Sequence, residues 1–232
     1  MSISDSINMF NDLGKASPPK PNQPIKAVLE FFENNLPEFI YENSGKRIDE
    51  DSFTQNLCII LNNNAIDKLF WFQFQNKEQQ KGNSPSIDIA VYTRGIIHIK
   101  NKSFTPKQRF FAFEAKILGI NDKKREKEYV IGKQRQNGGI ERFKRNIHGK
   151  DLPKTGMIGY IIKNDFNYWY KTVNEWIDEL SNKASNTIKW ETKDKLKKVP
   201  SSLFRVKKFN SIHSRIKNNS IQIYHYWIDL KP

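Results

Sequence analysis

The chain has little cysteine: Cys58 is the only one among 232 residues. This excludes an internal disulfide framework and favours a reducing compartment, which we expect to be the cytoplasm. Because Cys58 lies in the apolar run 57–61, we expect a small buried side chain rather than a nucleophile. The sequence also lacks the cysteine and histidine spacing of zinc sites and the glycine-rich loop of nucleotide-binding proteins.

Long apolar runs are missing as well. No stretch reaches the roughly 18 consecutive apolar residues of a membrane-spanning helix. The first residues do not show a basic segment followed by an apolar one, which is typical of a secretory signal. We therefore expect a soluble protein without a membrane partner.

Acidic residues are fewer than basic ones: the chain has 25 aspartates and glutamates and 39 lysines and arginines, which gives a net charge of +14. Such an excess favours a polyanionic partner, and DNA is the partner we expect, with an anionic membrane surface as the alternative. The 16 phenylalanines, 8 tyrosines and 5 tryptophans supply material for one substantial core.

The distribution of proline indicates how the chain is divided. Four of the ten prolines fall within residues 14–24, which predicts an extended tether. We expect residues 1–24 to form a tail and residues 25–232 to form a single domain. A tether of this kind offers a docking segment for a protein partner.

Hydrophobic periodicity predicts the elements of that domain. Apolar residues at helical spacing predict one helix from Ile25, a second one capped by Asp49, a third over residues 140–147 and a fourth capped by Asp165. Strands are predicted at residues 69–75, 87–91, 110–118, 156–162, 203–216 and 221–230, the last two joined as a β-hairpin. The polar residues 181–202 are expected to be a surface excursion. This order predicts an α/β fold with a central mixed β-sheet flanked by helices and a C-terminal β-hairpin.

Three charged residues stand within predicted strands. Asp88 lies in one apolar run, and Glu114 and Lys116 lie in another, where the period of two places both on the same face. A solvated strand face is the simplest alternative, but the second run is apolar on both faces, and buried charges need a partner or a metal. Two carboxylates are suitable ligands for Mg²⁺ or Mn²⁺ beside a phosphate, and a lysine there would orient or deprotonate water.

The residues Pro85-Ser86-Ile87-Asp88, followed by Glu114-Ala115-Lys116, resemble the motif of the PD-(D/E)xK nuclease superfamily, whose fold is the restriction-endonuclease-like core. The proline lies two residues further from the aspartate than in the idealised motif. The link between the two halves is longer than a tight hairpin, so residues 93–107 are expected to form an elaborated loop. Neither departure removes a ligand.

The resemblance implies metal-dependent hydrolysis of DNA phosphodiester bonds. Asp88 and Glu114 would bind Mg²⁺ or Mn²⁺, and Lys116 would position or activate the attacking water. Members of the superfamily often add an acid from an upstream helix, and Glu50 matches that role on the inward stripe of its helix, with Asp49 and Asp51 as open alternatives. The resemblance also implies an effector of bacterial anti-phage defence or restriction.

Basic residues around the motif are expected to hold the nucleic-acid backbone. Those predicted to do so are Arg94, Lys102, Lys107, Lys133, Arg135, Arg142 and Arg145, together with Gln134, which is also suited to orienting a water. His213 and His225 in the predicted hairpin are expected to be paired, satisfied strand histidines.

Two alternatives to DNA cleavage stay open: a catalytically inactive nucleic-acid-binding module, and an RNA-cleaving nuclease of the same fold. A homodimer and a partner that docks on the tail stay open as well. Composition does not distinguish between these functions.

Overall fold

The computed structural model describes residues 23–78, 84–99, 102–120, 122, 125–132, 138–183, 188–216 and 219–232. Its longer helices are α2 (Gln23–Asn43), α3 (Glu50–Asn64) and α5 (Phe166–Ser181), and its short helices are α4 (Gly139–Lys144) and η2 (Thr192–Asp194). The strands are β1 (Phe70–Lys77), β2 (Ser86–Thr93), β3 (Ile97–Ile99), β4 (Lys102–Phe104), β5 (Arg109–Leu118), β6 (Lys154–Ile161), β7 (Lys197–Val199), β8 (Val206–Ser214) and β9 (Ser220–Asp229).

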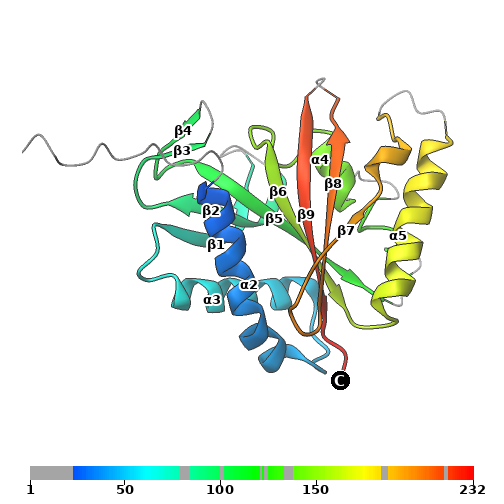
Figure 1. Ribbon diagram of the computed structural model, residues 1–232, viewed down its shortest axis with the longest axis horizontal. Coiled ribbons are helices and arrows are strands. Elements are labelled where there is room, and N and C mark those ends of the chain that lie inside the picture. The colour runs from blue at the N-terminus through cyan, green and yellow to red at the C-terminus, as the bar shows by residue number, and fades with distance from the viewer. Residues whose placement is uncertain are drawn as a thin grey trace, which may run out of the picture.

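Seven strands form one mixed sheet in the order β1-β2-β5-β6-β9-β8-β7 (Figure 1). The pairs β1–β2 and β2–β5 are antiparallel, β5–β6 and β6–β9 are parallel, and β9–β8 and β8–β7 are antiparallel. The predicted central mixed sheet is therefore confirmed. Because β9 pairs with β6 as well as with β8, the last two strands belong to the central sheet itself.

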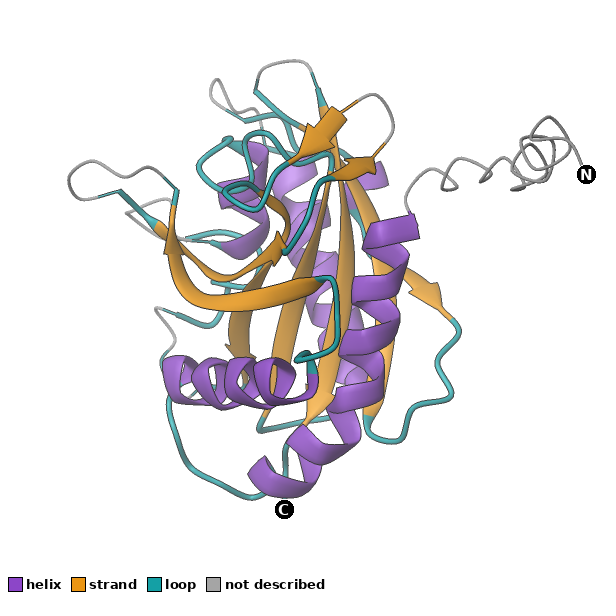
Figure 2. Cartoon of the chain, turned by 90° about the vertical axis from the view of Figure 1, so that its left-hand side faces the viewer, coloured by secondary structure: helices purple, strands orange, loops and turns teal. Residues whose placement is uncertain are grey.

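Helices lie on either side of the central strands (Figure 2). From α2, Phe32 stacks on Phe113 of β5 with ring centroids 4.6 Å apart, and Phe39 lies 5.8 Å from Tyr160 of β6. Phe113 thus points to α2, so its neighbour Glu114 points to the opposite face, where α4 lies. The aromatic residues that the composition provides fill the space between the helices and the sheet.

Helix boundaries agree with the predicted caps. The Asp49 side chain accepts a hydrogen bond from the Ser52 amide, and the Asp165 side chain accepts one from the Tyr168 amide. Helix α2 begins at Gln23, so the predicted tether is wrong for Gln23 and Pro24, which form the first helical turn, where proline is favoured. Residues 1–22 of the predicted tail lie outside the described part of the chain.

Two segments predicted as loops contain strands. Residues 97–104 include the small β3–β4 sheet, inside the long link between Asp88 and Glu114. The predicted surface excursion at residues 181–202 is wrong in part, because Ile188, Trp190 and Leu196 are buried and β7 extends the sheet edge. The segment is mostly polar, so its few apolar residues did not form a pattern that predicts burial.

None of the helices in the described ranges has both the length and the apolar character needed to cross a membrane.

Candidate active site

The candidate site lies where β2 and β5 separate. Their antiparallel pairing ends at Ile89 and Phe113, so the following β5 amides have no backbone partner on β2. The side chain of Asp88 accepts a hydrogen bond from the Ala115 amide at 2.6 Å, and Glu50 accepts one from the Ile117 amide at 2.8 Å. The two carboxylates take the place of the missing strand, because buried backbone donors require an acceptor.

Lys116 is the centre of the cluster. Its Nζ lies 2.8 Å from Glu50 Oε1, 3.3 Å from Glu114 Oε1 and 2.7 Å from the Ala115 carbonyl oxygen. Burial alone would lower the pKa of Lys116, but Glu114, Glu50 and Asp88 outweigh it and raise that pKa above its usual value. Lys116 is therefore a buried, permanently charged ammonium in this arrangement, and it holds carboxylates from α3 and β5 together.

The carboxyl groups of the cluster are not equivalent. Burial, followed by the charge of Glu114, raises the pKa of Asp88 well above its usual range. Burial would raise the pKa of Glu114 too, but the charges of Lys116, His148 and Arg142 lower it. The site thus contains an ionised Glu114 beside an Asp88 that is costly to ionise, which is the kind of divergence found at functional sites.

A second group of residues surrounds Glu114 on the α4 side. Arg142 Nη1 donates to Glu114 Oε1 at 2.9 Å and lies 3.1 Å from His148 Nε2. His148 Nε2 lies 3.4 Å from Glu114 Oε2, and His148 Nδ1 lies 3.2 Å from Glu78 Oε1. Glu78 also accepts from the Gly149 amide at 3.0 Å and pairs with Arg109.

Sequence reasoning did not identify Glu78 and His148. Glu78 follows the end of β1 and its amide donates to the Pro85 carbonyl oxygen at 2.9 Å, directly across from the start of the motif. The sequence offered two signals for these residues: an acid a few positions before Pro85, and the His148-Gly149 pair after a predicted helix. Neither signal has the fixed spacing of a known motif.

The structure distinguishes Glu50 from its acidic neighbours. Asp49 caps α3, and Asp51 accepts a hydrogen bond from the Gln75 side chain at 3.2 Å. Only Glu50 of the three has a described contact with Lys116. The helical periodicity that placed Glu50 on the inward stripe agrees with this geometry.

The predicted phosphate-binding residues fall into three groups. Arg94, Lys102 and Lys107 are exposed on the β3–β4 side of the molecule. Arg142 turns inward onto Glu114, while Arg145 pairs with Glu141 at 2.9 Å. Lys133, Gln134 and Arg135 lie outside the described residues.

The strand histidines are buried and hydrogen-bonded, as predicted. Ser211 Oγ lies 2.6 Å from His213 Nε2 and 2.7 Å from His225 Nε2. His213 Nδ1 lies 3.2 Å from Asp194 Oδ1, and His225 Nδ1 lies 2.8 Å from the Tyr129 hydroxyl. The order Asp194, His213, Ser211 resembles a nucleophilic triad in connectivity, but its burial excludes a substrate from Ser211.

The donor set of the cluster fits a hard divalent cation, because its ligands are carboxylate oxygens. The pKa of Asp88 is raised first by burial and then by the charge of Glu114, and a cation beside this carboxyl group would favour its ionised form. Glu114 Oε2 is buried and accepts no hydrogen bond of good geometry. As the side chains of the described ranges stand, no three carboxylate, histidine or cysteine groups are close enough to coordinate one ion, because the ammonium of Lys116 lies between Glu50 and Glu114.

Comparison with known proteins adds no relative. No family model matches the sequence. The searches of curated proteins and of solved structures also gave no match.

Proposed function

We propose that this protein is a metal-dependent nuclease that hydrolyses DNA phosphodiester bonds. The observation that carries the proposal is the convergence of Asp88, Glu114, Lys116 and Glu50, from two strands and one helix, at the point where β2 and β5 separate. A solvated strand face would leave these residues apart and exposed, whereas Glu114 and Lys116 are buried.

The order of elements supports the proposal. Helix α3, the three antiparallel strands β1, β2 and β5, helix α4 and the parallel strand β6 follow the order expected of a restriction-endonuclease-like core. We propose that these elements are that core and that β8 and β9 form the C-terminal β-hairpin. The four motif residues then occupy the positions that the PD-(D/E)xK resemblance implies.

Asp88, Glu114 and Glu50 are the residues that would hold Mg²⁺ or Mn²⁺. When bound, the ion supplies positive charge to the phosphate oxygens and lowers the pKa of a coordinated water. Because the pKa of Lys116 is raised, this residue acts as a hydrogen-bond donor that positions the water or stabilises the phosphate, and not as the general base. Arg142 fixes the orientation of Glu114 through its bond to Oε1.

The net charge of +14 supports a nucleic-acid substrate. Arg94, Lys102 and Lys107 provide backbone contacts without sequence information, and Lys133, Gln134, Arg135 and Arg145 complete the proposed set. Arg142, which was predicted for the same role, is paired with Glu114 instead. As the superfamily resemblance implies, we propose a role as a cytoplasmic effector of bacterial anti-phage defence or restriction, acting as a homodimer or with a partner docked on residues 1–22.

The test is cleavage of supercoiled plasmid, linear DNA and structured RNA in Mg²⁺, Mn²⁺ or chelator. The assay compares wild type with Asp88→Ala, Glu114→Ala and Lys116→Ala. The control is Asp51→Ala, because Asp51 is the residue after Glu50 and contacts Gln75 instead of the cluster. We expect wild type to cleave DNA only when the metal is present. Of the variants, Asp51→Ala should retain this cleavage and the three site variants should lose it. Cleavage in chelator, or cleavage by all three site variants, contradicts the mechanism.

The two alternatives give different results in the same assay. An inactive binding module binds DNA in a salt-sensitive manner but cuts none of the substrates. An RNA-cleaving enzyme cuts the structured RNA and leaves both DNA forms intact.

A further inference from the structure

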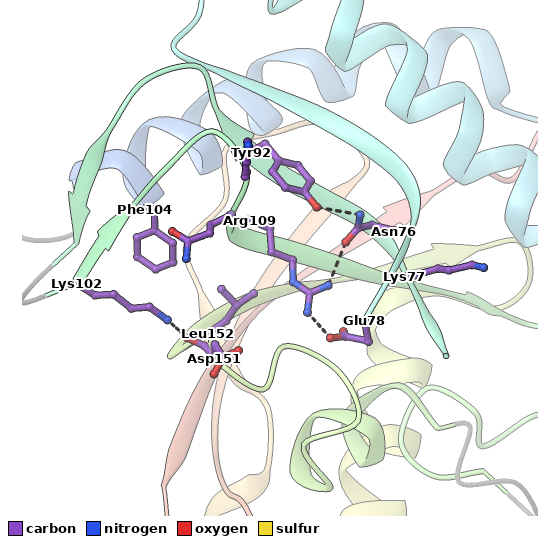
Figure 3. Close-up of a pocket in the computed structure, with 11 residues that line it drawn as sticks. Asn76, Lys77, Glu78, Tyr92, Lys102, Phe104, Arg109, Asp151 and Leu152 are labelled. Atoms are coloured by element: carbon purple, nitrogen blue, oxygen red, sulfur yellow. Dashed lines mark hydrogen bonds and ion pairs between the residues drawn. The ribbon is translucent and has the colours of Figure 1, made fainter. Parts of the chain in front are cut away.

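A pocket of about 240 Å³ adjoins the candidate site (Figure 3). Its walls come from the end of β1, from Tyr92 of β2, from residues 102–109 and from Asp151 and Leu152 before β6. The ammonium of Lys102 donates to the Asp151 carbonyl oxygen at 3.3 Å and so connects two of these walls. Segments far apart in the sequence therefore form one concave surface.

The floor of the pocket is a fixed polar group. Arg109 donates to Asn76 Oδ1 at 3.1 Å and pairs with Glu78, and Asn76 donates to the Tyr92 hydroxyl at 2.9 Å (Figure 3). The Arg109 side chain is 16% exposed and the Glu78 side chain 7% exposed. The guanidinium is thus held in place before any ligand arrives, which reduces the entropic cost of binding.

The charges of the pocket favour an anion. Lysines 77, 102 and 107 line it together with Arg109, although Lys77 points away from the other labelled side chains. The opposing acids are Glu78 and Asp151. Burial would raise the pKa of Glu78, but His148 and Arg109 lower it, so this carboxylate is already compensated. A net positive charge remains toward a ligand.

One side chain links the pocket to the carboxylate cluster. Glu78 lines the pocket and lies 3.2 Å from His148 Nδ1, and the other ring nitrogen of His148 lies 3.4 Å from Glu114 Oε2. A single imidazole therefore separates the pocket wall from the cluster.

We infer that this pocket binds one phosphate group of the nucleic-acid strand, next to the phosphate that is cleaved. Lys102 and Lys107 contact that phosphate, and Arg109 supplies the fixed positive floor. The volume is below the roughly 300 Å³ of pockets for larger ligands, so it suits a single phosphate with its sugar. The position along the strand rests on the proposed function, whereas binding in the pocket does not require cleavage.

The experiment measures binding and cleavage separately. Fluorescence anisotropy in chelator, over a range of salt concentrations, gives the affinity of a labelled single-stranded oligonucleotide for wild type and for Lys102→Ala/Lys107→Ala. The matched control is Lys171→Ala/Lys189→Ala, with the same loss of charge at side chains 77% and 79% exposed. Both pocket lysines are exposed, so we expect the pocket variant to fold, and the Tm of each variant is compared with that of the wild type to check this.

We expect the slope of log affinity against log salt to fall by about 0.7 in the pocket variant, because the pocket binds one phosphate and each phosphate contact to a single strand contributes about 0.7. The control variant should keep the wild-type slope to within about 0.3. Equal slopes in the two variants overturn the inference even if the wild-type protein cleaves DNA. A specific loss in the pocket variant supports it even if no substrate is cleaved, in which case only the proposed function fails.

Discussion

The ammonium of Lys116 on β5 lies 2.8 Å from the carboxylate of Glu50, the first residue of α3, across 66 positions of sequence. The other oxygen of Glu50 accepts the Ile117 amide from the same strand. The start of α3 is thereby fixed to the open side of β5, beside Asp88 and Glu114. This contact makes Glu50 part of the proposed site rather than a residue that only begins a helix.

Replacing Glu50 should reduce cleavage without unfolding the protein. Glu50→Gln loses the charge that faces Lys116, and we expect the initial rate of plasmid cleavage to fall about 10- to 100-fold, as for groups that orient or hold a metal. Asp51→Asn changes the adjacent acid and should retain the wild-type rate. Equal losses in the two variants would show that general charge at the start of α3, not Glu50, affects the rate.

Removing the central ammonium should destabilise the fold. Lys116→Met leaves Glu50, Asp88 and Glu114 without their shared cation, and we expect a loss of about 3–5 kcal/mol in unfolding free energy at pH 7. The loss should diminish as the pH falls toward 5, because the carboxylates left without their cation then take up protons and lose their charge. Urea unfolding at both pH values measures this, with Lys116→Arg as the control that keeps the charge; a pH-independent loss would indicate a packing effect alone.

Added metal should stabilise the native state. At a Mg²⁺ concentration ten times the Kd, a single site raises the unfolding free energy by about 1.4 kcal/mol, seen as a higher Tm. Asp88→Asn should remove this shift, while Asp51→Asn should preserve it. An identical Tm shift in the Asp88 variant would mean that the ion binds elsewhere.

Stability should decrease in mild acid because of two buried histidines. Burial lowers the pKa of His213 despite Asp194 nearby, and burial, with the charge of His213, lowers the pKa of His225 further. Above their ordinary pKa of 6.5 both histidines are neutral in the folded and in the unfolded state. Below that pH the histidines of the unfolded chain become protonated, while those of the folded chain stay neutral, so acid favours unfolding.

Each of these histidines should therefore reduce the unfolding free energy by up to about 1.4 kcal/mol per pH unit below that value. Thermal unfolding between pH 7.5 and 5 measures the slope. His225→Asn should flatten it, whereas His98→Asn, at an exposed position, should not. A slope unchanged in the His225 variant contradicts the assignment.

The buried pair of Lys144 and Asp194 should be essential for stability. Their charged atoms are 2.7 Å apart and both side chains are 0% exposed. Lys144→Met leaves a buried carboxylate whose remaining partners among the described residues are His213 and the Glu191 amide, and we expect a loss of about 3–5 kcal/mol by urea unfolding. Lys26→Met breaks an exposed pair with Glu30 and should cost less than about 1 kcal/mol; comparable losses in both variants would refute the distinction.

Much of the fold followed from local patterns. Continuous apolar runs predicted the strands around Asp88 and Glu114, and the caps Asp49 and Asp165 marked the starts of their helices. The segment at residues 188–199 was not predicted, since its few apolar side chains are scattered among lysines. They become buried only by tertiary packing, which no local pattern indicates. Helix α4 is shorter than predicted, because the chain turns after Lys144 to bring His148 to Glu114.

The sequence by itself determined that Glu114 and Lys116 share a face, because side-chain direction in a strand depends only on spacing. It also determined that their strand is buried, since apolar residues occupy both of its faces. Only the tertiary structure decided which acid of α3 meets Lys116, that Arg142 turns inward to Glu114, and that Glu78 and His148 join the pocket to the cluster. Those contacts depend on where β2 and β5 separate and on how loops from distant parts of the chain close around that point, which no local pattern encodes.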